Sequence, residues 1–386
     1  MIRDPDQLSE LLSEVGTFIR DECLPLEEQV DREGVIHESL VRRMREIGLF
    51  GHSIPQEFGG AGLTAEELGL VNFEVSQVST AFRARFGGNI GIASESIVVD
   101  GTASQKEMYL PRLASGEMTG CFALTEPDAG SDATALKTTA LRDGEHYVLS
   151  GRKCFITNAP LADLFTVFAR TDGLERGADG ITAFLVERNT PGLTTSAEYD
   201  KMGQHGSPVG DVSLDHVRVH RSSIVGGLEN AGFRTAMKAL NKQRINLASL
   251  CVGPAIRLVR EMVGHARARK QFGKSIAEYQ LVQQMIAESN TEVYAARALV
   301  LETARKRDSG IDVTMEASMC KLFASEMCCR VADRAVQVFG GRAYLRGNVA
   351  ERLYRDARVF RLYEGTSQIH IMNIAKHTMQ LRDVSA

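Results

Sequence analysis

Near the C-terminal end, a carboxylate, a glycine and two hydroxyls follow one another in a pattern that could support proton transfer. Tyr363, Glu364 and Gly365 precede Thr366 and Ser367, either of which can cap the helix that we expect to follow. Because glycine lacks a side chain, Gly365 lets a ligand or another backbone approach closely. We place Glu364 on an extended stretch outside the helix, where its carboxylate could act as a general base. Taken alone, a carboxylate of this kind is more often an exposed surface group.

Two earlier segments carry groups that suit a flat cofactor or its phosphates. Residues 124–132 gather hydroxyls, a glycine and backbone amides in one turn, which could donate several hydrogen bonds to a ring edge or a pyrophosphate. Residues 153–158 set Phe155 beside Thr157, and an aromatic ring next to a hydroxyl suits a flat group with polar edges. By themselves, an ordinary hydrogen-bonded turn explains the first segment better, and a core position explains Phe155 equally well.

The pattern of apolar residues around these segments changes twice along the chain, from helical to strand-like and back to helical. Residues 1–120 carry apolar side chains at helical spacing. Residues 121–231 contain short apolar runs, such as 164–169 and 181–186, separated by Gly and Asp turns that are typical of strands. Helical periodicity returns over long segments in residues 232–386, which suggests a helix bundle. We therefore expect a mainly α-helical protein with a β domain, divided at these boundaries.

Bulk composition narrows the class of protein. The 386 residues exceed the roughly 250–300 that one core supports, so several domains are expected. The net charge of -4 gives no sign of nucleic-acid binding, and no apolar run approaches the ~18 residues of a membrane span. The 7 cysteines lack zinc-type spacing, so we expect reduced thiols and no metal site. The acidic N-terminus resembles neither a signal nor a transit peptide, which favours a cytoplasmic location; a mature mitochondrial form is the alternative.

Taken in chain order, the three segments and others further along form an ordered set of motifs. The motifs are Thr125-Glu126-Pro127-x-Ala129-Gly130-Ser131-Asp132, Phe155-Ile156-Thr157-Asn158, Arg269-Lys270-x-Phe272-Gly273-Lys274, Gln337-Val338-Phe339-Gly340-Gly341 and Tyr363-Glu364-Gly365-Thr366-Ser367-Gln368-Ile369. This set resembles that of the acyl-CoA dehydrogenase family, in its short- and medium-chain or glutaryl-CoA-like branches. The resemblance covers the whole chain and implies an N-terminal helical domain, a middle β-barrel and a C-terminal four-helix bundle.

The resemblance also implies FAD as the cofactor, shared between the subunits of a homotetramer. The residues expected at the flavin from the same chain are Phe122, Leu124, Thr125, Gly130, Ser131, Phe155, Thr157, Thr366 and Gln368. Those expected to reach the FAD of a neighbouring subunit are Arg269, Phe272, Gln337, Val338, Gly340 and Gly341. Many relatives carry Trp where this chain has Phe155, and Phe can stack but donates no hydrogen bond.

The activity that the resemblance implies is α,β-dehydrogenation of an acyl-CoA thioester to a trans-2-enoyl-CoA. Glu364 would remove the α proton while the β hydride passes to flavin N5, and an electron-transfer flavoprotein would accept the electrons. We expect burial by the acyl chain to raise the pKa of Glu364 toward neutrality. Some relatives carry the base where this chain has Gln243, which cannot accept a proton. The residues expected to contact the substrate are Arg83, Ser131, Asn241, Arg244, Tyr363 and Gly365.

Arg83 leaves the class of substrate open. It falls where glutaryl-CoA dehydrogenases carry the arginine that binds a distal carboxylate, and an arginine in an apolar pocket needs an anionic partner. A carboxylated or sulfinated acyl group is therefore one alternative, while an exposed Arg83 and an apolar short or branched acyl chain form the default. A dehydrogenase of acyl-carrier-protein thioesters, or an oxidase, is another alternative on the same fold. A non-catalytic helical scaffold would bind no flavin.

Overall fold

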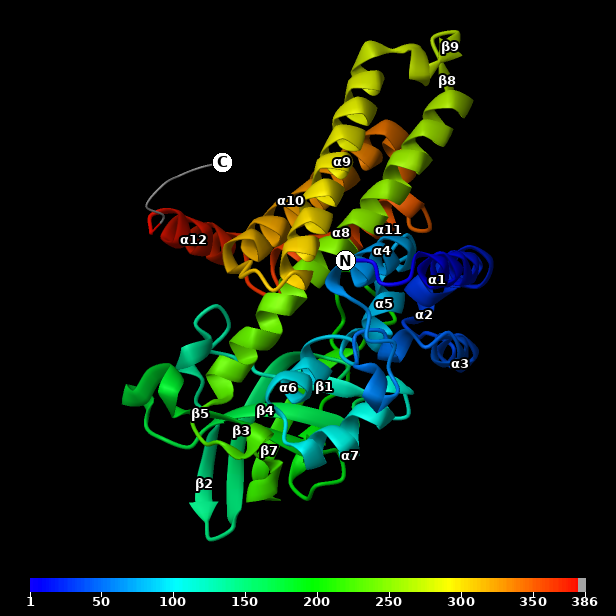
Figure 1. Ribbon diagram of the computed structural model, residues 1–386. Helices are drawn as coiled ribbons and strands as arrows, with labels where there is room; N and C mark the ends of the chain where they lie inside the picture. The colour runs from blue at the N-terminus through cyan, green and yellow to red at the C-terminus, as the bar shows by residue number, and fades with distance from the viewer. Residues whose placement is uncertain (381–386) are drawn as a thin grey trace.

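The computed structural model describes residues 1–380 and shows helical N- and C-terminal domains joined to a middle β domain (Figure 1). The long helix α8, Gly232–Ala268, runs from the β domain past the N-terminal helices into the C-terminal bundle. It contacts strand β5, helices α4 and α6, and helices α9 and α10. Since α8 contacts every domain, residues at its middle lie where the domains meet.

The N-terminal domain is built from short helices around an apolar core that includes Val15, Phe50 and Phe82. N-capping residues begin several of these helices. The Asp4 side chain accepts hydrogen bonds from amides in the first turn of α1, and Thr64 forms a capping box with Glu67 at the start of α4. The helices are α1 Pro5–Thr17, α2 Glu27–Glu33, α3 Glu38–Glu46, α4 Ala65–Val75, α5 Thr80–Gly87, α6 Ile92–Asp100 and α7 Ala103–Ala114. A π-helical turn, Phe18–Cys23, continues α1.

The expected β-barrel is realised as a curled sheet of 7 strands in the order β1-β4-β2-β3-β7-β6, with β5 paired to β4. Strand β4 is buried along its whole length because its two faces pack into different apolar clusters, Phe165 and Val167 in one and Leu164 and Phe168 in the other. This explains its continuous apolar run. The strands are β1 Gly120–Ala123, β2 Thr139–Asp143, β3 His146–Thr157, β4 Leu164–Arg170, β5 Ile181–Glu187, β6 Leu193–Thr195 and β7 Val209–His220.

The C-terminal domain is a bundle in which α10 contacts α8, α9 and α12. Its core is lined by small side chains, among them Ala296, Ala317 and Ala335, which let the helix backbones approach closely. A small hairpin joins α8 to α9 at the end of the bundle farthest from the β domain (Figure 1). The elements are β8 Lys270–Gln271, β9 Lys274–Ser275, α9 Gln280–Asp308, α10 Thr314–Phe339, α11 Val349–Ala357 and α12 Ser367–Thr378.

Within residues 1–380, no helix has the length and hydropathy that crossing a membrane requires. The cysteines of this part of the chain are all free, and only Cys329 is not fully buried. No group of His, Cys, Asp or Glu side chains among the described residues could hold a metal ion.

Candidate active site

Glu364 lies in a sharp turn between a short 3-10 segment, Arg358–Arg361, and helix α12. The prediction of an extended stretch at Glu364 is wrong. The φ of Glu364 is 53° and that of Gly365 is 94°, both in the left-handed region. The prediction that this helix is capped by a hydroxyl is confirmed, because the Thr366 side chain accepts from the amide of Ile369. The turn therefore projects the Glu364 side chain away from α12 and into the junction of the domains.

Both carbonyls of this turn are held by buried side chains. The Nζ atom of Lys321, on α10, donates to the Gly365 carbonyl at 2.6 Å. His370, on α12, places Nε2 at 3.2 Å from the Glu364 carbonyl. A Cβ at residue 365 would lie 2.9 Å from the same nitrogen, so this position requires glycine both for its φ and for its space.

The carboxylate of Glu364 lies among cations from three helices. Burial raises the pKa of Glu364 to about 7, against the opposing effect of Arg83, Lys321 and Arg244. Its Oε2 atom is shielded from solvent and has no hydrogen-bond partner among the described residues. A carboxyl group with a pKa near neutrality and a free oxygen is suited to accept a proton from a bound ligand.

Arg83, on α5, is buried and faces the same carboxylate. Its side chain makes no ion pair within residues 1–380, and its Nε is a buried donor without an acceptor. Burial lowers the pKa of Arg83, while Glu364 and Tyr363 act in the opposite direction. Gly87 makes room for the guanidinium, because a Cβ there would lie 2.5 Å from its Nη1 atom. The alternative of an exposed Arg83 does not hold in this structure.

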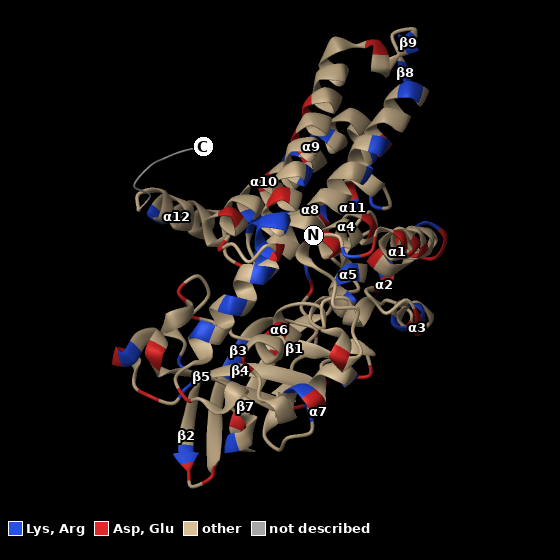
Figure 2. Cartoon of the chain, in the orientation of Figure 1, with Lys and Arg blue, Asp and Glu red and all other residues tan. Residues whose placement is uncertain are grey.

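Arg244 and Asn241 lie one turn apart on α8, and Arg244 donates to the Asn241 side chain at 2.7 Å. Basic side chains recur along this half of α8 (Figure 2). Asn241 also lines a cavity of about 300 Å³ between α6, α8 and the start of α10. Other residues of this cavity are Glu95, Lys238, Arg307, Asp312 and Thr314. Asn241 therefore links this cavity to Arg244, whose guanidinium is one of the cations near the Glu364 carboxylate.

The predicted flavin segments come together at the edge of the sheet. Phe122, Leu124, Thr125, Gly130 and Ser131 lie on β1 and the loop after it, and this loop is tied to β3 because Cys154 donates its amide to the Thr125 carbonyl at 2.9 Å. At the end of β3, Phe155 has a φ of 58° and leaves 67% of its surface exposed, next to the exposed Thr157.

This donor set fits a flavin. The Phe155 ring is turned outward rather than packed into the core, and it lies next to the Tyr199 ring, with ring centroids 5.4 Å apart. The exposed Thr157 follows two residues later, and the backbone of the Thr125 loop is bonded to the neighbouring Cys154. An outward aromatic face bordered by hydroxyls and backbone amides is suited to a flat ring with polar edges. The alternative interpretation, that Phe155 is an ordinary core residue, is therefore excluded.

A buried ion pair between Lys153 and Glu126 holds the loop after β1 against β3. Lys153 is completely buried, and its Nζ donates to Glu126 at 2.7 Å and to the Leu124 carbonyl at 3.2 Å. Glu126 also accepts the amides of Lys137 and Thr138. Burial lowers the pKa of Lys153 to about 8; for Glu126 burial acts to raise the pKa, but its donors outweigh it and lower that pKa.

The remaining predicted cofactor residues lie elsewhere in the chain. Arg269 and the 94% exposed Phe272 are in the hairpin region at the end of α8 (Figure 1). Gln337, Val338, Gly340 and Gly341 are at the end of α10, which is adjacent because Phe339 stacks on His265 of α8 with ring centroids 4.3 Å apart. Thr366 and Gln368 start α12, beside Glu364. One chain therefore presents two separate groups of predicted cofactor residues.

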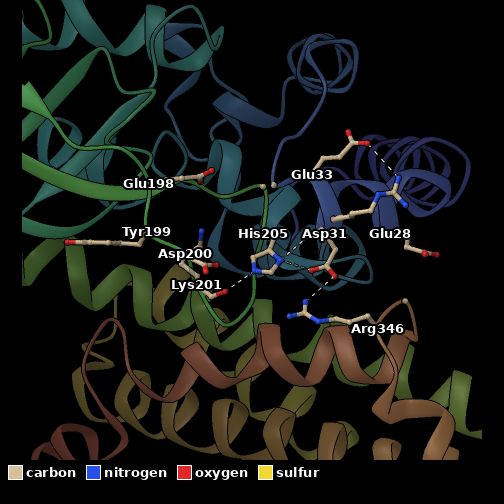
Figure 3. A pocket seen from close by; sticks show the side chains of 13 residues that line it. Glu28, Asp31, Glu33, Glu198, Tyr199, Asp200, Lys201, His205 and Arg346 are labelled. Atoms are coloured by element: carbon tan, nitrogen blue, oxygen red, sulfur yellow. Dashed lines mark hydrogen bonds and ion pairs between the residues drawn. The ribbon is translucent and has the colours of Figure 1, made fainter.

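A second cavity, of about 560 Å³, contains none of the predicted site residues (Figure 3). It lies between α2, the loop that precedes β7 and Arg346. In Figure 3 dashed lines join His205 and Arg346 to Asp31. The Asp31 carboxylate also pairs with Arg355, which the figure does not draw. Both acidic and basic side chains line this cavity, and many of them form ion pairs with one another. The cavity has no buried, unpaired carboxylate like that of Glu364 among its described lining residues.

Four residues support the candidate base or the flavin loop in ways that the sequence analysis did not predict: Lys321, His370, Lys153 and Glu126. Lys321 did leave a signal, because it is a lone charge on the apolar face of α10 between Ala317 and Ala324. His370 left none, because its role depends on the way α12 folds back toward the turn.

Comparison with known proteins agrees with this fold. The chain matches the acyl-CoA dehydrogenase N-terminal domain over residues 5–117, the middle domain over 121–217 and the C-terminal domain over 230–379. The fold and these matches define a flavoprotein oxidoreductase, and the chain belongs to the acyl-CoA dehydrogenase family.

Individual relatives extend over almost the whole chain. The chain is 38% identical to the caffeyl-CoA reductase-Etf complex subunit CarC of Acetobacterium woodii, over 90% of this chain and 91% of that protein. It is 35% identical to glutaryl-CoA dehydrogenase of Desulfococcus multivorans, over 97% of each. The structure of butyryl-CoA dehydrogenase from Megasphaera elsdenii superimposes with a TM-score of 0.94 at 31% identity, covering 98% of this chain and 100% of that one.

Proposed function

We propose that this protein catalyses FAD-dependent α,β-dehydrogenation of an acyl-CoA thioester, with Glu364 as the base. The observation that carries the proposal is the state of Glu364: a shielded carboxylate with an unpartnered oxygen and a pKa of about 7, at the junction of three domains. At neutral pH such a group can take a proton from an α carbon that is held against it. Bound FAD would supply the hydride acceptor.

The cations around Glu364 support the same chemistry. As the α proton leaves, negative charge develops on the thioester, and preorganised positive groups stabilise it without reorganising. Arg83, on α5, and Arg244, on α8, are already in place near the carboxylate. Tyr363 and Gly365, which flank the base, would border the thioester.

We propose that the CoA portion lies along the first half of α8. Asn241 and Arg244 would bind it, and the cavity next to Asn241 offers cationic groups from Lys238 and Arg307 to its phosphates. The exposed hydroxyl of Ser131 is available to both substrate and cofactor at the edge of the β domain.

We propose that the active protein is a homotetramer in which subunits share each FAD. Arg269, Phe272 and the end of α10 are separated within one chain from the flavin loop, and the nearly complete exposure of Phe272 supports a partner surface there. An electron-transfer flavoprotein is the proposed electron acceptor, as the name of the Acetobacterium woodii relative suggests.

The central test is anaerobic titration of the purified holoprotein with butyryl-CoA, followed by the visible flavin spectrum. Bleaching of the flavin bands in the wild type and its loss in Glu364→Gln support the proposal. A Glu364→Gln variant that bleaches as fast as the wild type contradicts Glu364 as the base. A folded protein that takes up no FAD contradicts the function as a whole.

A second candidate substrate is favoured by Arg83 alone. A buried guanidinium without an anionic partner is unfavourable, and a carboxylate or sulfinate at the end of the acyl group would supply that partner. Parallel titration with glutaryl-CoA and butyryl-CoA tests this. If Arg83→Met loses bleaching by glutaryl-CoA but keeps that by butyryl-CoA, Arg83 binds the distal anion; if neither titration changes, it does not.

A further inference from the structure

Lys321 is an unusual residue for the interior of a helix bundle. Its side chain is completely buried on α10, among the small apolar residues that face α8. It forms no ion pair with any carboxylate of residues 1–380. Its Nζ donates a hydrogen bond to the backbone carbonyl of Gly365. Burying an ammonium group without a paired carboxylate is costly, so the group must be retained for something other than stability.

The turn that Lys321 holds is itself strained. Glu364 is a non-glycine residue with a φ of 53°, followed by Gly365 at 94°, and such a pair persists only where its surroundings enforce it. Three side chains do so through four hydrogen bonds. Lys321 binds the Gly365 carbonyl, His370 binds the Glu364 carbonyl, and Glu326 accepts from both Arg361 and Ser367 at the two ends of the turn.

These contacts come from two helices and hold one turn, residues 361–367. Lys321 and Glu326 belong to α10, and His370 belongs to α12. Burial lowers the pKa of His370 to about 4, so the ring is neutral at pH 7 and its Nε2 can donate to the carbonyl while Nδ1 stays bare. Lys321 is the member of this set that carries a charge close to the Glu364 carboxylate.

We propose that Lys321 is a positioning residue for Glu364: together with His370 it fixes the left-handed turn that aims the carboxylate, and its ammonium holds that carboxylate in the ionised, proton-accepting form. This inference deepens the proposed function and rests on it. Lys321 touches the backbone of the turn and acts on the reaction through Glu364.

The two parts of the proposal have different signatures, because the two supporting side chains differ in charge. The groups facing Glu364 are Arg83 from α5, Arg244 and Cys251 from α8, Lys321 from α10, His370 from α12 and the adjacent Tyr363. Removing a cation from this set disfavours the carboxylate, so the pKa of Glu364 rises. Removing the neutral His370 loosens the turn and leaves that pKa nearly unchanged.

The experiment compares Lys321→Met, His370→Leu and the wild type as FAD-loaded proteins, with Lys306→Met as a control on the neighbouring helix α9. The acid limb of the rate of flavin bleaching by butyryl-CoA is followed against pH. We expect Lys321→Met to move this limb upward by about one pH unit. His370→Leu should lower the plateau about tenfold or more without moving the limb. Lys306→Met should change neither.

Hydrogen–deuterium exchange of the peptide 361–369 in substrate-free holoprotein gives a readout that does not depend on turnover. Lys321→Met and His370→Leu should exchange faster there than the wild type, and elsewhere the patterns should match. If Lys321→Met does not fold, Lys321→Gln, which keeps a polar end and loses the charge, is measured in the same way. An unmoved acid limb together with unchanged exchange overturns the proposal.

Failure of the proposed function is distinguished by Glu364→Gln. If that variant still bleaches, Glu364 is not the base, and the exchange data alone then decide whether Lys321 positions the turn. If Glu364→Gln is inactive but Lys321→Met matches the wild type in both measurements, the proposed function stands and the role of Lys321 is rejected.

Discussion

At the scale of single residues, the site is a set of buried charges that are not paired for stability. Among residues 1–380, Glu364 has an oxygen and Arg83 a donor without a hydrogen-bond partner, and Lys321 is bound to a carbonyl instead of a carboxylate. Stable cores pair or exclude such groups, and exceptions mark sites where a ligand or a reaction completes the arrangement. These residues therefore destabilise the ligand-free protein, which makes their substitution measurable as stability.

Glu364→Gln should stabilise the protein above neutral pH. A carboxyl whose pKa is about 7 in the folded protein and 4.5 when unperturbed binds more protons in the folded state, so its contribution to stability falls as pH rises between those values. The variant should match the wild type near pH 4.5 and exceed it at pH 8 by on the order of 3 kcal/mol. Urea unfolding of both proteins at the two pH values checks this; equal differences at both would contradict the shifted pKa.

Arg83→Met should raise the melting temperature of the ligand-free protein by a few degrees, on the order of 1 kcal/mol. The reason is that methionine fills much of the same space without burying an unpaired charge. Arg85 offers a matched control on the same helix: it is equally buried, but it donates to Thr119 and lies over the Phe50 ring. Arg85→Met should lower the melting temperature. A fall with both variants would mean that Arg83 is held by contacts as good as those of Arg85.

At the scale of elements, strand β3 positions the predicted flavin surface through its buried end. Lys153 and Glu126 bind the loop after β1 to β3, while the neighbouring Phe155 turns outward. In a regular strand Lys153 and Phe155 would share a face, but the register shift between Lys153 and Ile156 and the left-handed φ of 58° at Phe155 turn its ring outward. One strand can therefore anchor the loop and border the cofactor. The stability of the loop and the retention of FAD should therefore change together.

Lys153→Met should destabilise the protein by ~3–5 kcal/mol, because it leaves the Glu126 carboxylate buried without its partner. It should also release FAD more readily on dilution, seen as an increase in free flavin fluorescence. Lys153→Met combined with Glu126→Gln should recover part of both losses, since no buried charge remains. Ser150→Ala, at a partly exposed position of the same strand, is the control for changes in β3 itself. Normal flavin retention in Lys153→Met would show that the loop does not need this pair.

At the scale of the whole molecule, the long helix α8 sets the distances between the groups of the site. Its first half carries Asn241 and Arg244 beside Glu364, and its far end leads to Arg269 and Phe272. A helix rises about 1.5 Å per residue, so residues this far apart in one helix cannot meet on one ligand of the same chain. If the first half of α8 binds the substrate of one site and its far end binds FAD, the two ends must serve different sites, and subunits must share them.

Subunit sharing predicts complementation between two defective chains. Glu364→Gln disables the base, and Arg269→Ala should disable the contact to the FAD of a neighbour. When the two variants are unfolded, mixed in equal amounts and refolded with FAD, paired subunits combine at random, and about a quarter of the sites should regain both intact groups. Activity in the mixture, absent from either variant alone, checks this. A mixture as inactive as its components would place each complete site within one chain.

The sequence by itself determined the order of helical and β domains, since periodicity, capping residues such as Thr64 and Thr366, and the apolar runs of the sheet are local signals. Its motifs also predicted the family, and they identified Glu364 as the candidate base. Only the tertiary structure decided the left-handed turn at Glu364, the burial of Arg83 and the support from Lys321 and His370. The physical reason is that charge, burial and backbone strain depend on contacts between helices that lie far apart in the chain, and no local pattern records those contacts.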